Sequence, residues 1–343
     1  MNTTEILKKL TAEYGGSGDE LFPSQTAAEL LKEFTDDITY DNLGSVIAHI
    51  GKRCDNKPTV LIDAHIDEIS MIVTHITNDG FLKVGACGGI DAHILPAQQA
   101  VIFGKKRLLG IVATKPPHLA KGDDAKKVMK VTDISIDTGL SGDEAKELIS
   151  LGDRVYICSS PAELCGGKFT SRAIDDRAGV TAILYSLELL SKEKELPVNL
   201  TVSFSSQEEV GTRGAKAAGF LTEPDYAIAV DVSFAHTSDA DEIQCGKLGK
   251  GVMIGVSPTL DKEMSKALTD CAEKAGIPYQ IEVMAGTTGT NADAISVSGK
   301  GVRACTLSIP IRYMHTPVEV AKISDIEATG RLIYQYIKEF RHA

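Results

Sequence analysis

Hydrophobic and polar positions follow two different patterns along this chain. Over residues 1–70 and 164–343, short apolar runs alternate with longer stretches in which apolar residues recur at helical spacing. Strands that alternate with helices are typical of an α/β fold, so we expect a mostly parallel sheet sandwiched by helices. The predicted strands span 59–67, 198–204, 226–232 and 301–310, and the predicted helices span 1–13, 24–34 (with Ser24 as its N-cap), about 175–192, 214–221, 262–275 and 323–340.

A different pattern fills residues 71–163. Short alternating segments are separated there by turn sequences such as Asn78-Asp-Gly80, a combination that favours β-hairpins. One short helical stretch lies at 142–150. The sequence therefore predicts two domains, an α/β domain formed by 1–70 and 164–343 and a small β domain, 71–163, inserted into it.

Composition limits the location and the partners. The 343 residues are 43% hydrophobic and carry a net charge of −11; nucleic-acid binding requires a basic surface, so we expect no nucleic-acid partner. No stretch approaches the roughly 18 uninterrupted apolar residues of a membrane span, and the N-terminus lacks the apolar core of a signal peptide. We therefore expect no membrane partner and a cytoplasmic location. The seven cysteines include no Cys-x-x-Cys pair, which argues against a zinc site built from thiolates.

Ionisable side chains gather where the predicted strands end. Most follow an apolar run directly, and one pair of aspartates stands where a helix begins. Ligands of α/β sheets bind outside the carboxyl ends of the strands, so we expect the side chains at the strand ends to converge on one site. They are His65, Glu208, Glu209, Asp231 and His315, and the aspartate pair at the helix start is Asp175 and Asp176.

Each of these motifs taken alone also has a purely structural interpretation. A Glu-Glu pair can be a solvated turn, and an aspartate at a helix start can be an N-cap. Capping needs one aspartate rather than two, however. His65 and Asp67 share a face of their strand, which suits a core histidine bonded to an aspartate and equally a metal-binding imidazole oriented by a carboxylate.

The combination fits a site for two metal ions. Two histidines and three carboxylates give each ion one histidine and one carboxylate of its own, with one aspartate bridging both. Two divalent ions would also balance the negative charges of these carboxylates and of Glu208, which would otherwise repel one another. Nitrogen and carboxylate ligands suit zinc, cobalt or manganese better than calcium. Such ions could lower the pKa of a shared water towards about 7, and Glu208 could accept its proton.

Five motifs, spread over nearly the whole chain, carry these residues. They are Asp63-Ala-His65-Ile-Asp67-Glu-Ile, Ala173-Ile-Asp175-Asp176-Arg177, Glu208-Glu209-Val-Gly-Thr-Arg-Gly-Ala, Ala229-Val-Asp231-Val and Ser308-Ile-Pro-Ile-Arg-Tyr-Met-His315-Thr-Pro-Val-Glu. Together and in this order, they resemble the motifs of the tetrahedral-shell dinuclear metalloaminopeptidases. Members of that family have also been labelled glutamyl aminopeptidases, deblocking aminopeptidases or endoglucanases.

The resemblance implies which residues bind which ion. His65 and Asp231 would complete the coordination of one metal ion, and Glu209 and His315 that of the other. Asp175 would bridge the two ions.

It also implies the remaining roles and the assembly. Glu208 would be the general base, Asp67 would orient His65, and the peptide bond between Asp175 and Asp176 would be cis. The family fold is an α/β catalytic domain with an inserted β-barrel-like domain, which agrees with the change of pattern at residue 71. Family members usually assemble as dodecamers built from dimers.

One loop departs from the family pattern. Many relatives carry Gly-Thr-Asp-Ala where this chain has Gly289-Thr-Asn291-Ala-Asp293. If this loop lines the substrate pocket, the substrate preference of relatives does not carry over to this chain. The predicted metal ligands are unaffected.

We therefore expect a metal-dependent aminopeptidase that forms a homo-oligomer. It would use two divalent ions per subunit, zinc or cobalt before manganese, to hydrolyse the N-terminal residue from peptides with a free amino terminus. An endoglucanase-type glycoside hydrolase is an alternative because paired carboxylates serve that chemistry, but the histidines would have no role in it and the chain has no Trp to stack on sugars. A non-catalytic shell protein, which would usually lack a ligand or the base, and a related dinuclear carboxypeptidase or deacylase are further alternatives.

Overall fold

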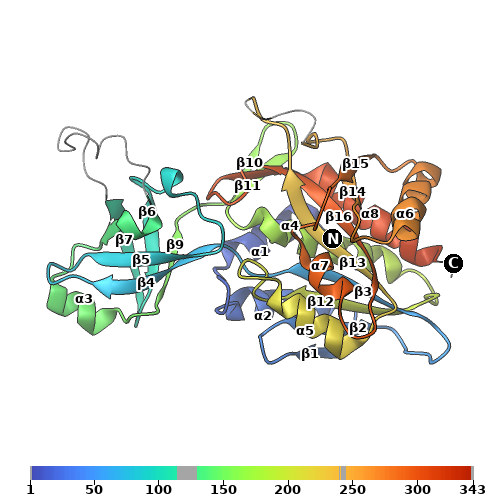
Figure 1. The fold of residues 1–343 in the computed structure, drawn as a ribbon, viewed down its shortest axis with the longest axis horizontal. Helices are drawn as coiled ribbons and strands as arrows, with labels where there is room; N and C mark the ends of the chain where they lie inside the picture. Colours follow the sequence, from blue (N-terminus) through green and yellow to red (C-terminus); the bar gives the residue numbers. More distant parts are fainter. Residues whose placement is uncertain (1, 114–129, 239, 241–244, 341–343) are drawn as a thin grey trace.

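The computed structural model describes residues 2–113, 130–238, 240 and 245–340. They form an α/β part and a small closed barrel, which lie next to each other along the long axis of the molecule (Figure 1). The expected α/β fold with a small inserted barrel is confirmed. None of the helices in the described part of the chain combines the length and the apolarity that a membrane crossing requires.

Eleven strands of the described chain form one sheet with a parallel centre. The order is β1-β2-β12-β3-β13-β16-β17-β11-β10, and β14 pairs with β16 and with β15. Strands β12, β3, β13 and β16 run parallel to one another, and the strands that continue the row at both edges pair antiparallel. The bounds are β1 Ile38–Tyr40, β2 Val46–Ile50, β3 Thr59–His65, β10 Ala162–Leu164, β11 Lys168–Ser171, β12 Asn199–Ser205, β13 Tyr226–Phe234, β14 Val252–Val256, β15 Tyr279–Val283, β16 Arg303–Arg312 and β17 Glu319–Lys322.

Helices cover both faces of this sheet. On β3, Val60 and Ile62 join one apolar core and Leu61 joins the other, because successive strand residues point to opposite faces. Helices α1, α2, α4, α6 and α8 contribute to the first core, and α5 and α7 to the second. The bounds are α1 Thr3–Ala12, α2 Leu21–Leu31, α4 Ile174–Leu190, α5 Arg213–Thr222, α6 Lys262–Ala275, α7 Asn291–Ser296 and α8 Ile323–Lys338.

The predicted start of the second helix is wrong. Helix α2 begins at Leu21, so Ser24 lies inside its first turn instead of capping it. The preceding Pro23 is tolerated there because the N–H groups of the first turn have no acceptor within the helix. The Ser24 hydroxyl donates a hydrogen bond to the carbonyl O of Gly44 at 3.3 Å.

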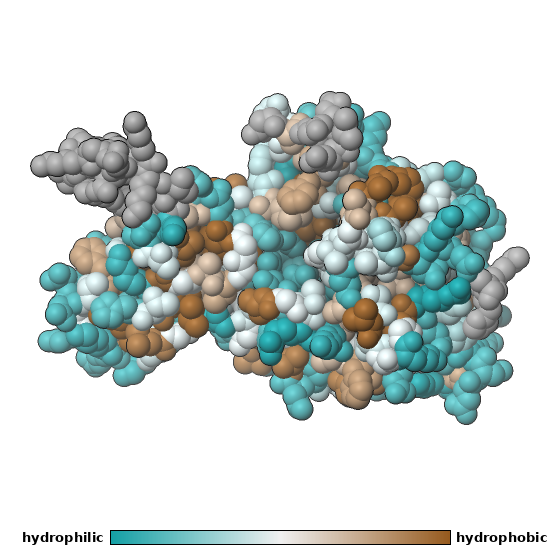
Figure 2. All heavy atoms as spheres, in the orientation of Figure 1, coloured by the Kyte–Doolittle hydropathy of each residue, from teal (hydrophilic) through white to brown (hydrophobic). Residues whose placement is uncertain are grey.

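Six strands close the barrel in the order β4-β5-β8-β7-β6-β9 around a separate apolar core. The turn between β4 and β5 requires Gly80, whose φ is 86° and whose position leaves no room for a Cβ next to the carbonyl O of Leu140. On the face shown in Figure 2, hydrophobic and hydrophilic residues are interspersed over the barrel and the α/β part. The bounds are β4 Ser70–Ile76, β5 Leu82–Cys87, β6 Gln99–Phe103, β7 Arg107–Ala113, β8 Ser135–Asp137 and β9 Arg154–Ile157, with α3 Gly142–Leu148 and the 3-10 helices Ala92–Ile94 and Val131–Asp133.

Both connections between the barrel and the sheet lie next to predicted site residues. The chain enters the barrel directly after His65 and Asp67, and it returns through β10 and β11 to the start of α4, where Asp175 lies. The insertion is therefore placed so that the barrel borders the carboxyl edge of the parallel strands.

Candidate metal centre and active site

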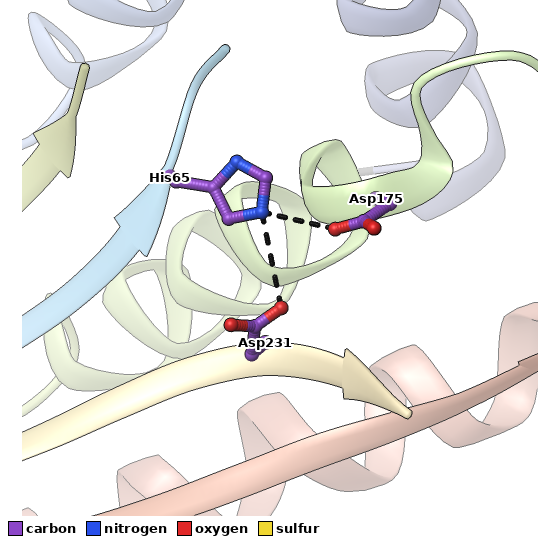
Figure 3. A group of neighbouring side chains, drawn as sticks. All are labelled: His65, Asp175 and Asp231. Atoms are coloured by element: carbon purple, nitrogen blue, oxygen red, sulfur yellow. Dashed lines mark hydrogen bonds and ion pairs between the residues drawn. The ribbon is translucent and has the colours of Figure 1, made fainter. Parts of the chain in front are cut away.

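His65 lies at the centre of a first group of side chains. It is the last residue of β3, and its Nε2 faces Asp175 at the start of α4 and Asp231 on β13 (Figure 3). Nε2 is 2.9 Å from Asp175 Oδ1 and 3.8 Å from Asp231 Oδ1. All three residues are buried. Strands β3 and β13 are parallel neighbours, so the sheet itself brings His65 and Asp231 to the same edge. We call these three residues the His65 group.

Asp175 also belongs to a second group, with Glu209 and His315. Asp175 Oδ2 is 3.2 Å from His315 Nε2, which is 3.5 Å from Glu209 Oε2. We call these three residues the His315 group. In each group, one ligand atom from every residue lies within 4.8 Å of the others. The five residues predicted to bind metal thus form two groups that share Asp175.

Asp67 connects the His65 group to the turn that follows β12. His65 Nδ1 is 3.1 Å from the backbone carbonyl O of Asp67 and 3.5 Å from its Oδ1. The carboxylate of Asp67 also accepts hydrogen bonds from the backbone N–H of Glu208 at 2.9 Å, from that of Glu209 at 3.2 Å and from the Ser17 hydroxyl at 2.7 Å. The residue predicted to orient His65 therefore lies against it and also holds the backbone of both glutamates, which the sequence did not indicate.

Glu208 lines the same cavity as the two groups. Its position depends on a tight turn in which Gln207 has a φ of 58° and the Glu208 carbonyl O accepts the N–H of Gly211 at 2.8 Å and of Thr212 at 2.9 Å. The Glu208 side chain is thus presented by a turn that is fixed on both sides by hydrogen bonds.

Two further residues hold the predicted ligands in position, and neither was predicted from the sequence. Glu319, buried at the start of β17, accepts the backbone N–H of Asp175 at 3.1 Å and that of His315 at 2.9 Å. The carbonyl O of Gly89, on the barrel side, is 3.0 Å from His315 Nδ1. Such partners fix the ring orientation of a metal-binding histidine. Glu319 lies in the last quoted motif, which was a usable signal, whereas no local pattern relates Gly89 to a histidine 226 residues away.

The start of α4 has an unusual backbone. The peptide bond between Asp175 and Asp176 is cis, as the resemblance implies. Both residues have non-helical φ and ψ, so the regular helix begins at Arg177. Asp176 belongs to neither group; its carboxylate accepts the N–H of Gly179 at 2.9 Å, and a Cβ on Gly179 would lie 2.5 Å from that carboxylate. Asp176 therefore packs against α4, and of these two aspartates only Asp175 faces His65 and His315.

Burial dominates the electrostatics of the site. It raises the pKa of Glu208 to about 7 and that of Glu209 to about 10, with a contribution from the neighbouring Asp175 carboxylate. Burial, again with a contribution from Asp175, raises the pKa of Asp231 well above its usual range. Burial alone would also raise the pKa of Asp175, but hydrogen bonds from His315 and His65 hold it below its usual range.

The histidines respond in the opposite way to burial. Burial alone lowers the pKa of His65, but its hydrogen bonds to Asp175 and Asp67 raise that pKa well above the usual value. The hydrogen bond to Asp175 likewise raises the pKa of His315, against the opposing effect of burial. Protons on the imidazoles and on the carboxyls thus balance the clustered negative charge.

This donor set fits divalent metal ions. Each group offers an imidazole Nε2 and carboxylate oxygens, the ligands that zinc, cobalt and manganese accept. Each Nδ1 is directed at a backbone carbonyl O, which leaves Nε2 free to coordinate. Carboxyls whose pKa values are raised by burial and by like charges become stable anions when a cation balances them. The residues therefore fit one ion in each group, with Asp175 shared.

A cavity of about 670 Å³ opens beside both groups, within the size range of small-molecule sites. Its walls include the end of β13, Ser308 in the middle of β16, strand β15 and the loop 288–290. This loop is part of the stretch that departs from the family pattern. The departing residue itself, Asn291, points into the core, where its Nδ2 donates to Asp63 Oδ2 at 2.7 Å and to Ser205 Oγ at 3.1 Å. Asn291 thus anchors the loop, and its neighbours line the cavity.

Known aminopeptidases are similar to this chain over most of its length. A model of the M42 glutamyl aminopeptidase family matches residues 44–332. The chain is 32% identical over 342 residues to the lysyl aminopeptidase of Pyrococcus furiosus, with 98% of this chain and 97% of that protein covered. It matches the structure of an aminopeptidase from Desulfurococcus kamchatkensis with a TM-score of 0.91 at 34% identity, covering 98% and 94% of the two chains. It also matches the TET1 peptidase of Pyrococcus horikoshii, described as assembling into a tetrahedron or a large octahedral shell, with a TM-score of 0.87 at 32% identity and 99% and 100% coverage.

Proposed function

Because the chain belongs to the M42 glutamyl aminopeptidase family, and is therefore an aminopeptidase, we propose that it hydrolyses the first peptide bond of peptides with a free amino terminus at the two histidine groups. The observation that carries this proposal is the sharing of Asp175 between two groups that each contain a histidine and a further carboxylate. The adjoining cavity is large enough to receive the first residues of a peptide.

In this proposal the two groups hold two divalent ions, zinc or cobalt before manganese. His65 and Asp231 would bind one, Glu209 and His315 would bind the other, and Asp175 would bind both. When bound, such ions polarise a carbonyl oxygen and lower the pKa of water towards about 7.

Glu208 would act as the general base. Glu208 lines the cavity, and burial raises its pKa to about 7, which suits an acceptor that takes a proton from water and then donates it to the leaving amine nitrogen. Asp67 would support this step by holding the Glu208 backbone and orienting His65. A Glu208→Gln variant keeps the shape of the side chain but cannot accept the proton.

We further propose a homo-oligomer of dodecameric type located in the cytoplasm. The tetrahedral shell described for the Pyrococcus horikoshii relative supports this assembly. The inserted domain, residues 71–163, would contribute to dimerisation, and 1–70 with 164–343 would form the catalytic domain.

The test measures chromophore release from Leu-, Glu-, Lys- and Ala-anilides after chelation and after addition of cobalt or zinc. We expect chelator-sensitive release from free substrates and none from N-acetylated ones. Glu208→Gln should retain two ions per subunit and lose about 10²- to 10⁴-fold in kcat. Full activity of this variant would refute the role of Glu208. Metal-loaded protein that is inactive on the whole panel would overturn the proposed aminopeptidase reaction.

A further inference from the structure

The cavity beside the metal groups contains one charged side chain that the proposed reaction does not use. Glu282, on β15, is the only charged residue among the described cavity-lining residues outside the predicted catalytic and metal-binding set. No lysine or arginine lines the cavity in the described part of the chain. The cavity therefore presents an unbalanced negative charge to whatever enters it.

Two hydroxyl groups hold the Glu282 carboxylate in place. Ser308 Oγ, on β16, donates a hydrogen bond to Oε2 at 2.7 Å, and Ser233 Oγ, on β13, donates one to Oε1. A carboxylate has about four acceptor positions, so both oxygens retain the capacity to accept a hydrogen bond from a ligand. Because both donors lie on strands of the central sheet, the carboxylate is fixed before any ligand arrives.

The same two serines relate Glu282 to the metal groups. Ser308 is the register partner of Asp231 in the parallel pair β13–β16, and Ser233 follows Asp231 by two residues and so shares its face of the strand. Glu282 thus lies on the same face of the sheet as Asp231. Across the strands, the two residues are separated by at least one strand spacing of about 4.8 Å. Met253, the register partner of Ser308 on β14, and Met284 add flexible apolar surface to the cavity wall.

We propose that Glu282 binds the cationic side chain of an N-terminal lysine or arginine, and that the enzyme consequently prefers basic first residues. This inference rests on the proposed aminopeptidase function. With the amino terminus of a peptide at the metal groups, the first side chain enters the adjoining cavity, its methylenes lie against the methionines and its charged end meets Glu282. An N-terminal glutamate would place a second carboxylate against Glu282 and is selected against.

The test compares lysine anilide with norleucine anilide, which has the same four-carbon stem without the charge. For the metal-loaded full-length protein we expect kcat/KM to be on the order of 10- to 100-fold higher for lysine, as for a hydrogen bond between charged groups. Glu282→Gln should bring the lysine-to-norleucine ratio close to 1. Glu282→Asp retains the charge on a shorter side chain and should retain part of the ratio. Ser308→Ala should lower it less than Glu282→Gln does.

A matched control removes an exposed carboxylate elsewhere. Glu263 on α6 pairs with Arg303 and does not line the cavity, so Glu263→Gln should keep the lysine-to-norleucine ratio of the unmodified enzyme. Release from norleucine that equals or exceeds release from lysine would overturn this inference and leave the aminopeptidase function intact. So would an equal loss for both substrates in Glu282→Gln, since Glu282 would then act on the shared amino terminus or on the fold. No release from any anilide would contradict the proposed function itself.

Discussion

The two histidine groups share Asp175 but are held in different ways. The His65 group is built on the sheet, with His65 and Asp231 on neighbouring parallel strands, and the His65 side chain is 2% exposed. The His315 group is built on loops: His315 has a φ of 61°, its side chain is 33% exposed, and its ring is oriented by Gly89 from the barrel side. Sites on strands are held more accurately than sites on loops. We therefore expect the His65 group to bind its ion more tightly.

The largest effect should come from the residue common to both groups. Asp175→Ala removes a ligand from each ion at once, so we expect fewer than one ion per subunit after dialysis. The lost transition-state stabilisation of several kcal/mol corresponds to a fall in kcat/KM of at least about 10³-fold. Metal analysis and anilide assays check both values. A variant that retained two tightly bound ions would show that Asp175 is not shared.

A chelator titration should separate the two groups. If the strand-built group binds more tightly, cobalt-loaded protein should release its ions in two steps, with affinities that differ by about 10- to 100-fold. His315→Ala should remove the weaker step and keep the tighter one, whereas His65→Ala should remove the tighter step. Release in a single step, or loss of the tighter step in His315→Ala, would contradict the comparison.

A smaller effect should follow from the contact between the barrel side and His315. A Cβ on Gly89 would lie 2.7 Å from His315 Nδ1, so Gly89→Ala should displace the ring and weaken only the ion of the His315 group, by about 10-fold. Gly85→Ala is the matched control, because its Cβ would meet no atom closer than 3.4 Å. Equal metal release by the two variants would mean that the barrel side does not orient His315.

The smallest effect concerns stability after metal removal. The raised pKa values of Glu208 (about 7), Glu209 (about 10) and both histidines mean that the metal-free folded protein binds more protons than the unfolded chain. These groups contribute their full stabilisation of the folded protein below the pKa values that they have in the unfolded chain. This stabilisation is lost as pH rises through 7 towards 10. The lowered pKa of Asp175 has the opposite sign, but its contribution is already constant above about pH 5.

Chelation should therefore lower Tm by several degrees more at pH 8 than at pH 6, as measured by calorimetry. In the metal-free protein, Glu209→Gln should raise Tm at pH 8 because it removes a buried carboxyl of the loop-built group. A chelation effect of equal size at both pH values would contradict this balance of protons.

The sequence predicted those parts of the molecule that local patterns specify. The apolar runs located β3, β12, β13 and β16, and their terminal residues led to His65 and Asp231. Strands β14 and β15 were missed, and with them Glu282, because these short strands are defined by pairing with β16 and with each other, and strand preference depends strongly on such context. The contact of Gly89 with His315 joins distant segments, so no sequence window contained it.

The shared carboxylate of Asp175 also has a thermodynamic consequence. If Asp175 binds both ions as proposed, occupancy of one histidine group would change the affinity of the other, and linkage requires the reverse effect to have the same size. The enzyme with one ion and the enzyme with two would then be coupled states, and the more weakly bound ion would set the fraction of active subunits. If the more weakly bound ion is the one in the His315 group, the rate of peptide hydrolysis would depend on the free metal concentration around the protein. The enzyme would then be regulated by its metal supply.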